Sequence, residues 1–139
     1  MKILVITNDF PPRVGGINYY VDQIFRRFPE GDVVVVAPTD DGDHEFDATW
    51  PHPVVRWHRR TLVPEPFFLK FLVDVVREHQ PDLVLFGALM PFGLVGTPLE
   101  KITGVPYGGF SHGVELSATR IPGGIAPMRM IGRNARIIT

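Results

Sequence analysis

The sequence contains no cysteine among its 139 residues. This absence excludes disulfide bonds, cysteine-based zinc sites, iron–sulfur clusters and a thiol nucleophile. The sequence also has no excess of charge, because 14 lysine and arginine residues are balanced by 15 aspartate and glutamate residues, for a net charge of −1. Without a positive surplus there is no overall field to hold a nucleic-acid backbone, so we predict no nucleic-acid partner.

Long hydrophobic runs are missing as well. No run reaches the ~20 apolar residues of a membrane span, and the first apolar stretch ends at Thr7, short of the ~7–15-residue core of a signal peptide. We therefore predict a cytoplasmic protein. The five histidines form no His-x-x-x-His pair, so no metal site is predicted.

Short β-branched runs alternate with helical patterns along the chain. Runs without polar alternation, typical of strands buried on both faces of a parallel sheet, span residues 2–7, 32–37 and 82–86, with weaker candidates at 54–57 and 105–110. Apolar residues recur at helical spacing over residues 17–28, 66–79 and 92–101. This alternation predicts an α/β fold: a Rossmann-like, doubly wound, mostly parallel sheet with helices on both faces.

The length of 139 residues fits one domain. Residues 40–47 are acidic and rich in turn-forming residues, and we predict a solvated surface loop there because the glycine and glutamate do not fall at calcium-loop offsets. Residues 136–139 resemble the start of another buried strand, after a helix-like segment at 126–134. We therefore expect the chain to be part of a longer protein.

Ligands of open α/β sheets bind beyond the carboxyl ends of the strands. The loop after the first predicted strand carries Gly15 and Gly16 just before a helix. Glycines let backbone approach a ligand closely, and a helix start offers unpaired N–H groups to an anion, so this loop predicts a phosphate or diphosphate site. The alternative is that the glycines only permit a tight turn. Neither Gly-x-Gly-x-x-Gly nor a P-loop motif is present, which disfavours a dinucleotide-dependent dehydrogenase.

A second loop, at residues 108–116, follows a later predicted strand. His112 lies there between Ser111 and Gly113, with Glu115 one turn further on. Its position in a loop makes His112 a functional candidate, although a structural hydrogen-bonding role is the alternative. Gly-x-Ser-x-Gly is absent, so a serine hydrolase is not predicted.

Basic and aromatic residues alternate over residues 56–60, ahead of the helix expected at 66–79. Such mixtures dock on anionic lipid surfaces in some proteins. The interpretation we favour is an ordinary helix that packs on the core, with a solvated basic segment before it.

The motifs Asn8-Asp-Phe-Pro-Pro-Arg-Val-Gly-Gly-Ile17 and Ser111-His-Gly-Val-Glu115 together resemble the N-terminal half of retaining GT-B glycosyltransferases. The likeness is greatest to actinobacterial mannosyltransferases that act on phosphatidylinositol mannosides. It implies that residues 1–139 are the N-terminal, acceptor-side Rossmann-like domain, one half of a GT-B fold. The C-terminal nucleotide-sugar domain is then absent from this chain, which is inactive alone.

The resemblance also implies a reaction. A sugar, mannose by the nearest likeness, moves with retention from a nucleotide sugar (GDP-mannose or a UDP-sugar) to a lipid or glycan acceptor. No metal or further cofactor is needed, because the acceptor hydroxyl attacks on the face that the nucleotide leaves and the donor phosphate takes the proton. A lipid acceptor would bring the protein to the inner face of the membrane.

Residue roles follow from the same resemblance. Gly15 and Gly16 contact the donor diphosphate, and His112 contacts the transferred sugar as the catalytic histidine, with Glu115 a further candidate beside it. The acceptor pocket is lined by Asn8, Asp9, Arg13, Asn18 and Tyr19. The alternative to an enzyme is a non-catalytic α/β module that binds a ligand or contacts another subunit.

Overall fold

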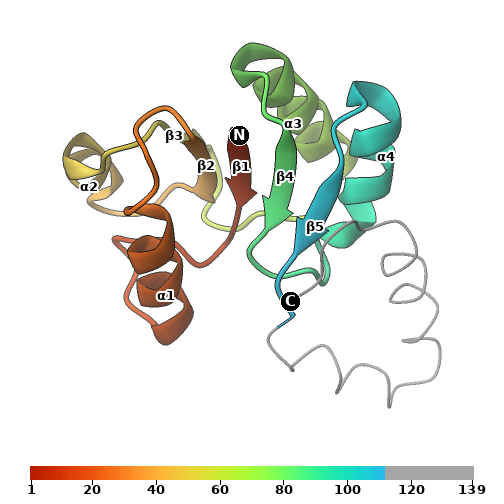
Figure 1. Ribbon diagram of the computed structural model, residues 1–139. Coiled ribbons are helices and arrows are strands. Elements are labelled where there is room, and N and C mark those ends of the chain that lie inside the picture. The colour runs from red at the N-terminus through yellow and green to blue at the C-terminus, as the bar shows by residue number, and fades with distance from the viewer. Residues whose placement is uncertain (112–139) are drawn as a thin grey trace.

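Five short parallel strands form the sheet of the computed structural model, which describes residues 1–111 (Figure 1). They are β1 (Ile3–Ile6), β2 (Val33–Pro38), β3 (Val54–Trp57), β4 (Leu83–Phe86) and β5 (Tyr107–Gly109). The strand order is β3-β2-β1-β4-β5 and every neighbouring pair is parallel. The expectations for residues 126–134 and 136–139 lie outside the described residues.

Both faces of the sheet are covered by helices. Helices α1 (Gly16–Phe25) and α2 (Asp43–Thr49) lie on one face, and α3 (Pro66–His79) and α4 (Gly93–Thr103) lie on the other (Figure 1). All residues of β1, β2 and β4 are therefore buried, which is why their sequences show no polar alternation. The predicted doubly wound α/β fold is confirmed.

Helix boundaries follow local chemistry. Helix α3 begins at Pro66, whose fixed φ suits a first helical position, and ends at His79, where the C-cap Gln80 takes a left-handed φ of 50°. Helix α1 ends at Phe25, before the predicted end at Phe28, and Phe28 instead packs on Phe25 with ring centroids 5.5 Å apart.

The expectation of a solvated loop at residues 40–47 is wrong. Helix α2 begins there, and Asp43 is buried while its carboxylate accepts hydrogen bonds from the Thr39 hydroxyl (2.8 Å) and the Asp40 N–H (3.2 Å). Burial opposes ionisation of Asp43, but these hydrogen bonds outweigh it and lower the pKa of the carboxyl. Phe46 packs edge-on against Phe10 at 5.6 Å. In this acidic segment Asp43 therefore stabilises the turn before α2, and Phe46 packs against the core.

The strand order places a topological switch point at β1 and β4, because the chain runs outward from β1 through β2 to β3 and then returns to β4 on the other side. The two strand ends are in contact: the Gly87 N–H donates to the Ile6 carbonyl at 2.8 Å. A Cβ on Gly87 would stand 2.6 Å from Thr7 Oγ1. The loop after β1 therefore leaves the sheet where ligands of such folds bind.

Candidate functional site

The loop after β1 leads into an uncapped helix start. Gly15 is the N-cap of α1, no side chain among residues 1–111 caps the helix, and no acidic residue stands in its first turn. The Tyr19 N–H donates to the Gly15 carbonyl at 3.0 Å. The N–H groups of Gly16, Ile17 and Asn18 precede that bond and have no intrahelical acceptor. With the positive end of the helix dipole they form a site suited to an anion.

The two glycines of this loop differ in what surrounds them. A Cβ on Gly15 would lie 2.7 Å from Asn18 Oδ1, so packing within the loop requires glycine there. Apart from its chain neighbours and the backbone of its own helix, no atom of the described residues would lie within 4 Å of a Cβ on Gly16, and the φ of Gly16 lies outside the left-handed region. Neither packing nor backbone conformation among the described residues accounts for Gly16, so the space beside it is open to a ligand.

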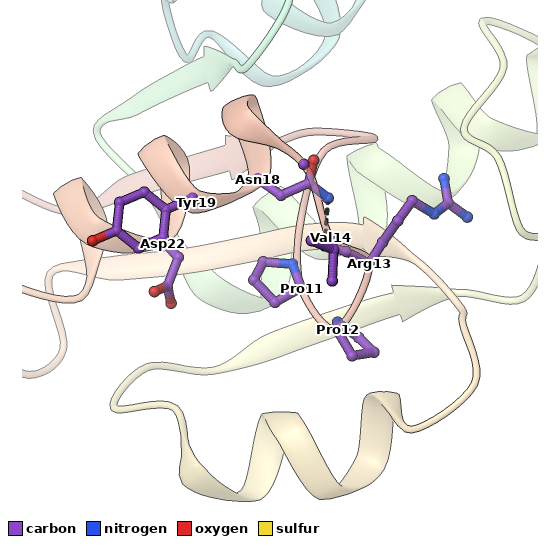
Figure 2. A pocket seen from close by; sticks show the side chains of 8 residues that line it. Pro11, Pro12, Arg13, Val14, Asn18, Tyr19 and Asp22 are labelled. Carbon is purple, nitrogen blue, oxygen red and sulfur yellow. Dashed lines mark hydrogen bonds between the residues drawn. The ribbon is translucent and has the colours of Figure 1, made fainter.

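A shallow pocket of about 180 Å³ lies between this loop and α1 (Figure 2). One wall is formed by Asn18, Tyr19 and Asp22 of α1, and the other by residues 11–15 of the loop. The pocket brings together four predicted site residues, namely Arg13, Gly15, Asn18 and Tyr19. Gly16, Asn8 and Asp9 do not line it.

Three of the predicted acceptor residues use their polar groups to hold the loop. Asn8 pairs with the backbone of Leu62, accepting from its N–H at 2.7 Å and donating to its carbonyl at 3.3 Å. Arg13 donates to the Asp40 carboxylate and to the Arg60 carbonyl, both at 3.1 Å. Asn18 is buried and donates to the Arg13 carbonyl at 2.9 Å (Figure 2).

The other two predicted acceptor residues keep their side chains open. Asp9 is partly buried and its N–H donates to Thr7 Oγ1 at 2.9 Å, but its carboxylate bonds to no residue of the described part of the chain. Tyr19 is 68% exposed at the mouth of the pocket. These two side chains are the ones available to a ligand's hydroxyl groups.

Residues beyond the predicted set complete the surroundings of the loop. Asp22 lines the pocket and accepts hydrogen bonds from Trp50 Nε1 (2.8 Å) and Arg26 (2.7 Å). Asp40 accepts from its neighbour's N–H and from Arg13, which together lower the pKa of its carboxyl. Asp22 carries a sequence signal, since it lies one helical turn after Asn18. The side chains that pair with Asp40, Arg13 and Arg60, are distant in sequence, so Asp40 carries no such signal.

The basic and aromatic segment at 56–60 is tied to its surroundings. Trp57 is buried against α3, and Arg59 pairs with Glu65 at 2.8 Å. Arg60 pairs with Asp41 at 2.8 Å. Helix α3 buries Phe68, Leu72, Val73, Val75 and Val76. The favoured interpretation of a core-packing helix is confirmed, although Phe67 at its start is 74% exposed.

His112 and Glu115 lie outside the described residues. Within residues 1–111, no three His, Asp or Glu side chains are grouped so that they could hold a metal ion. No helix in this part of the chain has the length and apolar character needed to cross a bilayer.

A parallel, doubly wound sheet whose first loop ends in an open helix start at the switch point defines a Rossmann-like domain, and the geometry of that loop suits an anion. Comparison with protein families is more specific, because the model of Glycosyltransferase Family 4 matches residues 14–138. The chain belongs to this family.

Relatives and solved structures agree with this assignment. The chain is 35% identical over 141 residues to a GDP-mannose-dependent monoacylated alpha-(1-6)-phosphatidylinositol monomannoside mannosyltransferase of Corynebacterium glutamicum. It is 32% identical over 142 residues to a GDP-mannose-dependent alpha-(1-6)-phosphatidylinositol monomannoside mannosyltransferase of Mycolicibacterium smegmatis. Each match covers 99% of this chain and 37% of the relative. The chain therefore spans little more than a third of the length of these relatives.

The fold has a solved counterpart in Alr3699/HepE of Anabaena, crystallised with UDP and glucose. The two superpose with a TM-score of 0.66 at 17% identity, over 99% of this chain and 37% of the other. At this identity the likeness concerns the fold, and it confirms the predicted class, one half of a GT-B fold.

Proposed function

We propose that this chain is the N-terminal, acceptor-side domain of a retaining mannosyltransferase that uses GDP-mannose and acts on a glycolipid. Family membership and the printed activities of the relatives support this proposal. The observation that carries it is Gly16, a glycine at an uncapped helix start with open space where its Cβ would be. A donor diphosphate placed there explains why the position lacks a side chain.

The proposed roles divide the loop residues in two. Gly15 and Gly16 face the donor diphosphate, whose developing charge the free N–H groups of α1 stabilise. Asp9 and Tyr19 hold acceptor hydroxyls, whereas Asn8, Arg13 and Asn18 keep the loop in place through the hydrogen bonds described above. His112 contacts the transferred sugar, with Glu115 beside it. The remaining donor contacts belong to a second domain, so this chain alone does not turn over.

The proposed reaction needs no protein nucleophile. The acceptor hydroxyl attacks the anomeric carbon from the face that the nucleotide leaves, the bond from that carbon to the phosphate oxygen breaks, and this phosphate takes the proton. The chain contributes the loop that orients the diphosphate and the groups that hold the acceptor against it.

A lipid acceptor implies contact with the inner face of the membrane. Phe67 (74% exposed) and Val63 (47% exposed) are neighbours of the Arg59–Glu65 pair at the start of α3, and shallow insertion of their side chains is compatible with their exposure. Co-sedimentation with phosphatidylinositol-containing vesicles tests this part. Loss of binding in Phe67→Ser supports it, and equal binding of this variant and the original chain contradicts it.

The central proposal is tested by an amide NMR titration of the chain with GDP-mannose, UDP-glucose and NAD. We expect GDP-mannose, and not NAD, to shift the amide signals of Gly15, Gly16 and His112. A response to NAD alone would contradict a glycosyltransferase domain. A lack of response to all three ligands would mean that the donor site needs the second domain, and the same titration of a chain extended through that domain would then decide between the diphosphate role of the glycines and a non-catalytic ligand-binding or subunit-contact module.

A further inference from the structure

The loop that precedes α1 has few backbone hydrogen bonds of its own. Pro11 and Pro12 have no N–H to donate, and the Asp9 N–H donates to a side chain, Thr7 Oγ1. The tip of the loop gains little from packing, since Val14 is 98% exposed. Its conformation therefore depends on side chains that reach it from other elements, and each such side chain is a candidate for setting the position of Gly15 and Gly16.

Arg56 of β3 contacts two consecutive residues of this loop, Phe10 and Pro11. Its guanidinium donates to the Pro11 carbonyl at 2.7 Å and lies over the ring of Phe10, 5.3 Å from the ring centroid. Phe10 is buried between Phe46 and Trp50, at 5.6 and 5.0 Å. One arginine thus fixes both the side chain of residue 10 and the carbonyl of residue 11, only four residues before Gly15.

The same guanidinium is anchored to two other elements. Arg56 forms a two-pronged ion pair with Asp47 of α2, from Nε to Oδ2 at 3.0 Å and from Nη2 to Oδ1 at 2.7 Å. Its Nη1 donates to the Pro38 carbonyl at the end of β2, at 2.9 Å. The side chain is only 11% exposed. The bidentate pair with Asp47 fixes the orientation of the planar guanidinium group. The direction of its hydrogen bond to the Pro11 carbonyl is therefore fixed as well.

We propose that Arg56 is a positioning residue for donor binding, which ties the glycine loop to β2 and α2 and thereby presents Gly15 and Gly16 in their binding conformation before a ligand arrives. Arg56 itself touches no ligand in this proposal. The link to donor binding rests on the proposed function, whereas the ordering of the loop is a property of the unbound chain. Lysine cannot replace arginine here, since an ammonium group lacks the planar fork that reaches Asp47, Pro38 and Pro11 together.

The test measures the loop and the ligand separately. Arg56→Lys and Arg56→Met are compared with two controls: Arg59→Met, which removes a cation from the neighbouring surface pair, and Leu99→Ala, which destabilises the core under α4. The first readout is the ¹⁵N order parameter of the Val14, Gly15 and Gly16 amides in the unbound chain. We expect it to fall from about 0.85 to below about 0.6 in both Arg56 variants and to stay unchanged in both controls.

The second readout is the affinity for GDP-mannose. We expect roughly tenfold or greater weakening in Arg56→Lys, because the ligand must then order the loop, and no change in Arg59→Met. If Arg56→Met does not fold, Arg56→Lys and Asp47→Asn are compared with the two controls instead.

Unchanged order parameters in Arg56→Lys would overturn the proposal, and so would an equal fall in Leu99→Ala. An original chain that binds no GDP-mannose would count against the proposed function, while the order parameters would still decide the role of Arg56.

Discussion

Replacing Gly16 by alanine separates a structural reason for glycine from a functional one. Apart from its chain neighbours and the backbone of α1, no atom of residues 1–111 lies within 4 Å of the position of the new Cβ, and the residue starts α1 with a φ outside the left-handed region. Alanine is favoured over glycine in a helix by about 0.5–1 kcal/mol. We therefore expect Gly16→Ala to unfold at the same or higher urea concentration, with an unfolding free energy raised by up to that amount.

The same substitution should weaken donor binding. The added methyl group occupies the open space through which a phosphate oxygen would approach the N–H groups of the helix start. Losing a hydrogen bond to a charged group costs about 1.5–3 kcal/mol, and about 1.4 kcal/mol corresponds to a tenfold change in affinity. We expect the Kd for GDP-mannose, measured by calorimetry or by NMR titration, to rise roughly 10- to 100-fold.

Gly15→Ala is the matched control, one residue away. Its Cβ would stand 2.7 Å from Asn18 Oδ1, and the Asn18 amide cannot move freely because it also donates to the Arg13 carbonyl. We expect this variant to lose about 1–3 kcal/mol of stability, as overpacked sites do. The reasoning is refuted if Gly16→Ala is as stable as the original chain and binds GDP-mannose equally well.

Three further outcomes are expected from substitutions away from the glycines. Asn8→Ala should lower the urea midpoint by the equivalent of about 1–3 kcal/mol, because both backbone groups of Leu62 lose their partner; an unchanged midpoint would contradict this. Asp43→Asn should destabilise by about 1.5–3 kcal/mol at neutral pH. Since the folded pKa of Asp43 is lowered from 3.8, the difference in unfolding free energy between the original chain and Asp43→Asn should persist above about pH 5 and disappear as the pH falls through the folded pKa. A difference that does not change with pH in urea titrations would contradict this. Gly96→Ala should reduce the thermal midpoint, because its Cβ would stand 2.6 Å from the Tyr107 ring, and a raised midpoint would disprove the close packing.

The fold was predictable because its signals are local. The runs in β1, β2 and β4 contain no polar alternation, which only a sheet covered on both faces permits, and Pro66 marks the start of α3. The acidic segment at 40–47 misled the prediction for the opposite reason. The Thr39 hydroxyl donates to Asp43, and Arg56 pairs with Asp47. These partners lie outside the segment, so the acidic residues appear solvated in the sequence although they hold a turn and a helix in the structure.

The sequence predicts where the candidate site lies, and four of the predicted residues line one pocket, but the sequence does not show which of them hold the loop. A glycine pair after the first strand of an α/β sheet marks the loop. It does not show that Asn8 is engaged with Leu62, 54 positions away, or Arg13 with Asp40, 27 positions away. Polar residues in a ligand-binding loop look alike in sequence whether they hold the ligand or the loop. Only the partners tell them apart, and the partners are contributed by the fold.

The partners also explain how an exposed loop can be ordered. Fixing each loop residue costs about 1–2 kcal/mol of conformational entropy, and the Pro11–Pro12 segment cannot offset this through N–H groups of its own. Side chains from other elements, Arg56 above all, supply the missing hydrogen bonds. Those hydrogen bonds go to loop carbonyls, and within the described residues no acceptor is bonded to the N–H groups that start α1. The order of the loop and the access to these N–H groups therefore depend on the same arrangement, in which β3 supports the loop and α1 presents the N–H groups that we propose for donor binding.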